Sequence, residues 1–172
     1  MTCGREMAGG LHSGETGEGG PADAEIEIAA MSMNPELADV VAALHWDLAE
    51  WLGSDALPKV FDRISGALDE EFTSVVTTGQ AVDRETLLAG LWSARNLQPG
   101  LEIRNLQPGL EIEVREVREL ARSGNLIVVR FLAENSLAET RTARWVTAVL
   151  VTDGRTCQWR TVHETPAPAD PG

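Results

Sequence analysis

The sequence predicts an α+β fold, in which helices pack on one face of an antiparallel sheet. Two observations lead to this prediction. Between residues 34 and 95, apolar residues recur mainly at every third or fourth position, and from residue 109 onward they recur at every second position. These are the periods of an amphipathic helix and of a half-buried strand. Helices followed by a run of hairpin-connected strands are typical of the α+β class.

Composition limits the classes of protein to consider. The chain has 172 residues, of which 43% are hydrophobic and 24% charged, which is enough for one domain with a core. Its net charge of −13 argues against a nucleic-acid partner and against binding to an anionic membrane surface. No apolar run approaches the roughly eighteen residues of a membrane span, and no apolar leader is present. We therefore expect a cytoplasmic protein.

The two cysteines lie in different contexts. Cys3 and Cys157 give neither a disulfide framework nor a metal-ligand pattern. We predict no metal and no cofactor.

The N-terminal segment, residues 1–33, is rich in glycine and acidic residues and poor in large apolar ones. Such a segment buries too little surface to offset its ordering entropy, so we predict that it is disordered. Translation starting at Met31 or Met33 would remove most or all of it. The predicted domain spans 34–166, and the proline-containing residues 167–172 should form a loose tail.

Three helices are predicted. The first begins at Asn34-Pro35-Glu36, where a capping side chain, a proline and an acid suit a helix N-terminus, and it ends at Gly53. The second carries apolar residues from Leu57 to Leu68. A short strand, 72–77, and a turn at Thr78-Gly79 follow. Asp83 is a suitable N-cap for the third helix.

Four strands are predicted after residue 109, joined as an antiparallel meander. Apolar and charged residues alternate from Leu110 into the first of them. The others are expected at Leu126–Ala133, Thr142–Val151 and Thr156–Thr165, with a polar loop at Asn135–Glu139. Asp153-Gly154 is a strong hairpin signal.

An exact tandem repeat separates the helices from the strands. Residues 95–103 and 104–112 both read RNLQPGLEI. The period is too short for a solenoid, so a recent or engineered duplication is the explanation. Only the second copy is contiguous with the following strand, so we place the surplus nine residues in the preceding loop. Loop entropy rises slowly with length, so this loop should be tolerated, and limited proteolysis should cut near residues 96–106.

Several segments together resemble one family. They are LHWDLAEWL, VFDRISGALDEEFTSVVTTGQAVDRETLLAGL, PGLEIEVREVREL, RTARWVTAVLV and QWRTVHETP. The chain over residues 37–166 resembles the domain-of-unknown-function 4440 group of the SnoaL-like and ketosteroid-isomerase-like (nuclear transport factor 2) superfamily. The resemblance implies a cystatin-like roll, that is, a cone-shaped curved antiparallel sheet packed against three N-terminal helices. It also implies an apolar pocket at the mouth of the cone and a homodimer through the outer sheet face.

The resemblance does not name a reaction, because one fold hosts many functions. Ketosteroid isomerases have a basic aspartate just before the glycine of the first hairpin, whereas the matching stretch 74–79 contains no carboxylate. No serine has the context of a nucleophile elbow. His163 and Glu164 are adjacent on a predicted strand, so they should point to opposite faces.

The predicted hairpin suggests which residues line the pocket. A two-residue loop at Asp153-Gly154 pairs Thr152 with Arg155, and this register places Arg144 opposite His163. We interpret the face with Arg144, Trp159 and His163 as concave, because it offers an apolar surface with few polar groups. Candidate catalytic residues are His163 and Arg144. The candidate pocket residues are Trp159, Trp92, Phe61, Phe131, Val146 and Thr161.

Structural roles compete with these functional ones. The tryptophans could serve packing alone, His163 could be a hydrogen-bonded structural residue, and His45 is interpreted as a boundary residue at the edge of the first helix's apolar stripe. Two functions therefore remain open. One is binding of a small apolar molecule without turnover. The other is proton transfer on a small carbonyl compound, with His163 as the base and Arg144 stabilising an enolate.

Overall fold

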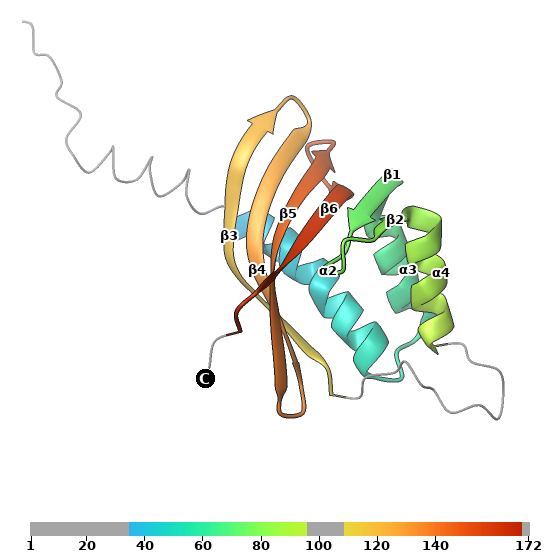
Figure 1. Cartoon of the computed structure of the whole chain (residues 1–172). Helices are drawn as coiled ribbons and strands as arrows, with labels where there is room; N and C mark the ends of the chain where they lie inside the picture. Colours follow the sequence, from blue (N-terminus) through green and yellow to red (C-terminus); the bar gives the residue numbers. More distant parts are fainter. Residues whose placement is uncertain (1–34, 96–108, 170–172) are drawn as a thin grey trace, which may run out of the picture.

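The computed structural model describes residues 35–95 and 109–169. In these ranges the chain forms three helices on one side of a curved sheet (Figure 1). The predicted N-terminal disorder and most of the first repeat copy lie outside the described residues. The helices are α2 (Pro35–Gly53), α3 (Pro58–Ala67) and α4 (Arg84–Arg95), and the strands are β1 (Leu68–Val75), β2 (Ala81–Asp83), β3 (Glu111–Ser123), β4 (Leu126–Leu137), β5 (Thr140–Thr152) and β6 (Cys157–Ala167).

The three predicted helices are confirmed. α2 ends at Gly53, as predicted. α3 has a proline in its first turn, where the missing N–H costs nothing. Asp83 caps α4, because its carboxylate accepts a hydrogen bond of 2.8 Å from the backbone N–H of Thr86. Leu68, which we assigned to the second helix, is instead the first residue of β1.

The antiparallel meander β3-β4-β5-β6 is also confirmed. The polar loop predicted at Asn135–Glu139 is wrong, since β4 continues to Leu137 and β5 begins at Thr140. Ala138 adopts a φ of 54°, in the left-handed region, and this allows a tight turn there. The polar side chains therefore belong to the ends of paired strands rather than to a loop.

The sheet is mixed rather than wholly antiparallel as predicted. Its strand order is β2-β1-β6-β5-β4-β3, and β1 runs parallel to β6. The sequence identified β1 as a strand but contained no signal for its partner. The parallel pair brings the short β1–β2 hairpin beside the end of the meander.

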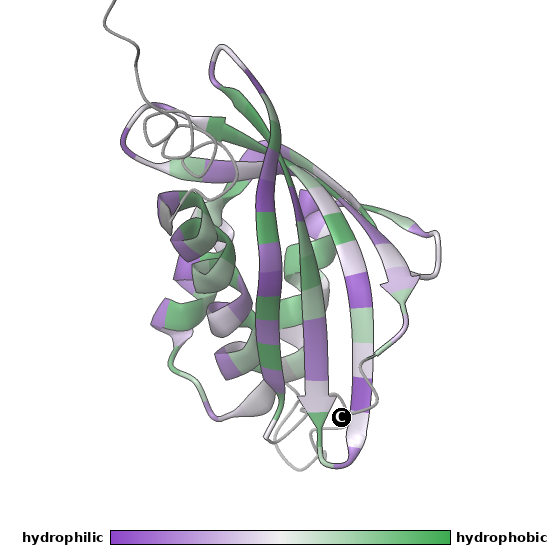
Figure 2. Cartoon of the chain, turned by 90° about the vertical axis from the view of Figure 1, so that its left-hand side faces the viewer, coloured by the Kyte–Doolittle hydropathy of each residue, from purple (hydrophilic) through white to green (hydrophobic). Residues whose placement is uncertain are grey.

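The core lies between the helices and the concave face of the sheet. Alternate residues of β4 and β5 are buried on this face, and Figure 2 shows hydrophobic and hydrophilic residues alternating along the strands. Trp51 ties α2 to α4 by donating a hydrogen bond of 2.7 Å from its indole nitrogen to the carbonyl of Leu91. None of the described helices is long and apolar enough to cross a membrane.

The β5–β6 hairpin departs from prediction in two ways. Thr152 pairs with Cys157 rather than with Arg155, so the connection is two residues longer than expected. A bulge at Arg160 then shifts the register, because Leu150 pairs with Trp159 whereas Val149 pairs with Thr161. A one-residue shift reverses the faces of all later residues. The longer loop leaves Trp159 on the concave face, and the bulge turns His163 away from it.

Candidate functional site

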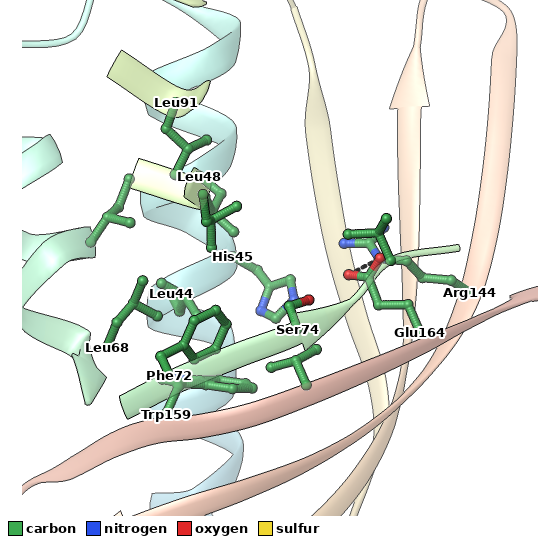
Figure 3. A pocket seen from close by; sticks show the side chains of 14 residues that line it. Leu44, His45, Leu48, Leu68, Phe72, Ser74, Leu91, Arg144, Trp159 and Glu164 are labelled. Atoms are coloured by element: carbon green, nitrogen blue, oxygen red, sulfur yellow. Dashed lines mark hydrogen bonds and ion pairs between the residues drawn. The ribbon is translucent and has the colours of Figure 1, made fainter. Parts of the chain in front are cut away.

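An apolar cavity lies between the helices and the concave face of β1 and β6, and we call it the inner cavity (Figure 3). Its volume is about 110 Å³, close to the size of cavities that hold a single aromatic ring. Four polar residues, His45, Ser74, Arg144 and Glu164, interrupt its apolar wall. The apolar lining consists of Leu44, Leu48, Ile64, Leu68, Phe72, Val76, Leu87, Leu91, Trp159 and Val162.

His45 is the buried titratable group of this wall. It is 5% exposed, and its ring points from α2 toward Ser74 and Trp159 (Figure 3). The ring packs edge-on against Phe131 and Trp159, at centroid distances of 5.1 and 5.9 Å. These aromatic contacts fix the ring in one orientation.

The hydrogen bonding of His45 defines its tautomer. Nδ1 lies 2.8 Å from the backbone carbonyl oxygen of Val41, and a carbonyl can only accept a hydrogen bond. Nδ1 therefore carries the proton and donates. In the neutral ring, Nε2 is then left with a lone pair and can only accept.

Burial keeps His45 uncharged. Loss of hydration on burial lowers its pKa from 6.5 to about 4, and the nearby positive charge of Arg144 adds to this effect. The hydrogen bond to Val41 acts in the opposite direction but is outweighed. At neutral pH the inner cavity thus contains a neutral hydrogen-bond acceptor.

An ion pair occupies one end of the inner cavity. Arg144 on β5 donates from Nε to Glu164 Oε1 on β6 at 3.1 Å, and from Nη1 to Asn135 Oδ1 on β4 at 2.6 Å. The side chains of Arg144 and Glu164 are only 14% and 21% exposed. Their charges offset each other, so this end is polar without a net charge.

A second hollow adjoins this pair, and we call it the outer hollow. It has a volume of about 460 Å³, and its lining is more polar than that of the inner cavity. Arg144 and Glu164 line it as they line the inner cavity. Its other lining residues are Thr77, Asn135, Thr142, Ala143 and Pro166.

The structure brings only part of the predicted site together. Arg144 and Trp159 line the inner cavity, as expected. Phe131 and Val146 are fully buried in the core and do not belong to its lining.

Three of the other predicted residues lie elsewhere. Phe61 and Trp92 line a shallow surface hollow by α3 and α4, with Trp92 stacked on Trp51 at a centroid distance of 6.0 Å. Thr161 is outside the lining of the inner cavity, and its hydroxyl lies 3.1 Å from that of Thr73.

The predicted pairing of Arg144 with His163 is wrong. His163 is exposed and lies opposite Thr147 on β5, because the bulge at Arg160 moves it to the outer face. Glu164 takes the place beside Arg144.

Sequence reasoning missed His45, Ser74 and Glu164. His45 lies four residues after Val41 on one helix face, which places it beside the apolar stripe but does not decide its burial. Ser74 lies two residues after the buried Phe72 on the same strand, so period two predicts its direction. Nothing local predicted the bulge that turns Glu164 inward.

Among the described residues, no group of three or more His, Cys, Asp and Glu side chains could hold a metal ion. The arrangement present is suited to hydrogen bonding and proton transfer within an apolar cavity.

Comparisons with known proteins agree on the fold. An NTF-2-like protein of unknown function from Pseudomonas aeruginosa matches with a TM-score of 0.66 and 23% identity, over 76% of this chain and 98% of that one. The fold is NTF2-like. A protein of unknown function with a cystatin-like fold from Nostoc punctiforme matches this chain with a TM-score of 0.57 and 9% identity, over 82% of this chain and 98% of that one.

A candidate scytalone dehydratase from Novosphingobium aromaticivorans shares the NTF2-like fold, with a TM-score of 0.57 and 8% identity over 86% of this chain and 89% of that one. No protein-family model and no curated protein matches the sequence. At these identities the NTF2-like fold is shared, and the function has to be argued from the site.

Proposed function

We propose that this protein binds a small, uncharged, largely apolar molecule that carries a hydrogen-bond donor. The inner cavity supports this proposal, and the observation that carries it is the neutral His45 in its wall. A ligand hydroxyl or N–H would donate to Nε2 of His45, while its apolar part would contact the surrounding leucines and Trp159. The cavity volume of about 110 Å³ suits one ring.

The apolar wall favours an uncharged ligand. Moving a charged group out of water into apolar surroundings costs far more than moving a neutral one. The charges of Arg144 and Glu164 are already directed at each other at 3.1 Å. A neutral ligand leaves that pair intact.

The test compares phenol with toluene, which share a ring but differ in the donor. Calorimetric titration of the full chain should give tighter binding of phenol. His45→Phe keeps an aromatic ring at this position and removes the acceptor, so the preference for phenol should fall by about five- to tenfold, the equivalent of one hydrogen bond. Equal binding of the two ligands by the unaltered protein would contradict the proposal.

A second candidate function is proton transfer on a small carbonyl compound. His45 now takes the role of base that the sequence suggested for His163, because it lines the inner cavity and its Nε2 is unprotonated. Arg144 would stabilise the enolate. A pKa of about 4 makes His45 a weak base at neutral pH, so binding without turnover is favoured.

Hydrogen–deuterium exchange at the methyl group of acetophenone would reveal this turnover. Exchange that depends on the protein and is lost in His45→Phe would favour the enzyme. A rate equal to that of buffer would leave binding as the function.

We also propose that a second copy of the chain covers the outer sheet face. This face carries Trp145, which is 37% exposed, opposite Leu132, and four residues farther along both strands Val128 lies opposite Val149 in the same register. Apolar residues gathered on an exposed sheet face are typical of interaction surfaces. Membership of the domain-of-unknown-function 4440 group and a cytoplasmic location remain predictions from the sequence.

A further inference from the structure

The inner cavity and the outer hollow share two lining residues, Arg144 and Glu164. The outer hollow has a more polar lining than the inner cavity, and the ion pair borders both. Figure 3 shows the pair among the residues that line the inner cavity. Any ligand whose ring occupies the inner cavity and whose substituent points to the outer hollow must place that substituent against this pair. The pair is therefore positioned to select the chemistry of the substituent.

The hydrogen bonds of the pair show what it can offer. Arg144 uses Nε and Nη1 for Glu164 and Asn135, and a guanidinium has five N–H donors in all. Glu164 engages Oε1 with Arg144, and within the described residues its Oε2 accepts no hydrogen bond. A donor and an acceptor are thus available side by side, with no net charge.

We propose that Glu164 makes this site selective for a neutral carboxamide-type group and excludes carboxylates. A carboxamide has one acceptor and one donor edge, which match the guanidinium and the free carboxylate oxygen. A ligand carboxylate would be attracted by Arg144 but repelled by Glu164 at a similar distance. The inference rests on the proposed function, because it assigns the substituent of a ligand held in the inner cavity.

The size of the effect follows from the burial of the pair. Two like charges about 4 Å apart interact strongly at an effective dielectric constant near 20, and a partly buried pair is only weakly screened by salt. Arg144 offsets part of this repulsion. Removing the negative charge of Glu164 should therefore change the ratio of amide to carboxylate affinity by on the order of tenfold or more.

The test measures binding of benzamide and benzoate to the full chain at pH 7, with phenol as a third ligand. The unaltered protein should prefer benzamide. In Glu164→Gln, which retains an oxygen acceptor for Arg144, benzoate should gain at least about tenfold relative to benzamide. The control is Glu71→Gln. Glu71 pairs with Arg160 at the exposed side of β1, so this change removes the same charge from an arginine partner elsewhere and should leave the ratio unchanged.

A second variant tests the opposite sign. Arg144→Gln leaves Glu164 without its cation, so the site should gain affinity for benzylammonium relative to benzamide. If Glu164→Gln and Glu71→Gln leave the same benzamide-to-benzoate ratio while phenol still binds, the selectivity inference is overturned. If phenol does not bind either, the proposed function itself fails and this inference fails with it.

Discussion

Three surroundings of His45 act on its charge: burial among aromatic rings, the carbonyl of Val41 and the positive charge of Arg144. Its pKa of about 4 lies well below the value of 6.5 for an exposed histidine. The protonated ring is therefore disfavoured in the folded state and is favoured in the unfolded state. This difference links the charge of one residue to the stability of the whole domain.

The sign of that linkage is fixed by the direction of the pKa shift. Above pH 6.5 both states carry a neutral His45, and stability is at its full value. As the pH falls from 6.5 toward 4, the unfolded chain binds a proton that the folded protein does not. The free energy of unfolding should drop by about 2 to 3 kcal/mol between pH 7.5 and 4.5 from this residue.

Urea unfolding of the protein and of His45→Phe at both pH values isolates this contribution. Other titrating groups affect both proteins, so the difference between them belongs to His45. The gap in unfolding free energy between the two proteins should shift toward the variant at pH 4.5, because only the unaltered protein loses the contribution of His45. A gap that does not change with pH would mean that His45 is not held neutral.

At the scale of the residue, prediction from sequence succeeded where direction follows from a regular period. Alternation along the strands placed Arg144 and Trp159 on one face, and the apolar character of that face with its few polar groups identified it as concave. His45 was misjudged because its helix position lies at the edge of the apolar stripe, where the packing partner decides burial. Phe131 and Trp159 come from distant strands, so this decision is a tertiary one.

At the scale of the element, the β5–β6 hairpin shows again that contacts distant in sequence limit prediction from local patterns. Asp153-Gly154 indicated a two-residue loop, but the Asp153 carboxylate accepts hydrogen bonds of 2.8 Å from the N–H groups of both Arg155 and Thr156, which stabilises a longer one. The bulge at Arg160 coincides with contacts from its guanidinium to Asp69 and Glu71 around β1. Those partners are about ninety residues away in sequence, so no local pattern could reveal them.

The junction of α2 with the start of β3 gives a prediction at this scale. A Cβ added to Gly53 would lie 3.1 Å from the carbonyl oxygen and 3.2 Å from the nitrogen of Leu110. Backbone atoms cannot rotate away, and the N–H of Gly109 also bonds the Gly53 carbonyl at 3.2 Å. Gly53→Ala should therefore lower the free energy of unfolding by about 1 to 3 kcal/mol.

Gly90→Ala is the matched control. Gly90 lies within α4, and nothing lies within 4 Å of its added Cβ. Alanine is the better helix former, so this change should raise stability by about 0.5 to 1 kcal/mol. Thermal unfolding of both variants measures the contrast, and two changes of the same sign would refute the close packing at Gly53.

For the whole molecule, the order of elements was the most predictable property. Three amphipathic helices followed by a meander leave few ways to bury one apolar face of each element. The parallel partner of β1 was not predictable, because strand periodicity carries no information about neighbours. The meander and this parallel pair together give the strand order β2-β1-β6-β5-β4-β3 of the described residues.

The outer sheet face yields a prediction about assembly. If a second copy covers Trp145, then Trp145→Glu should place like charges in the interface and convert a dimer to a monomer. Trp46→Glu is the control, because Trp46 is 64% exposed and lies on α2, on the helical side of the sheet. Native mass spectrometry should report a halved mass for the first variant only, and a monomeric unaltered protein would contradict the assembly.

The central claim is that the inner cavity presents the unprotonated Nε2 of His45 to a ligand. Nitrogen-15 NMR of the histidine rings measures this directly, with His45→Phe used to assign the signal. At pH 7 the His45 ring should be neutral with the proton on Nδ1, and added phenol should shift the Nε2 resonance as it accepts a hydrogen bond. A ring protonated on both nitrogens, a proton on Nε2, or an Nε2 signal unmoved by saturating phenol would contradict the claim.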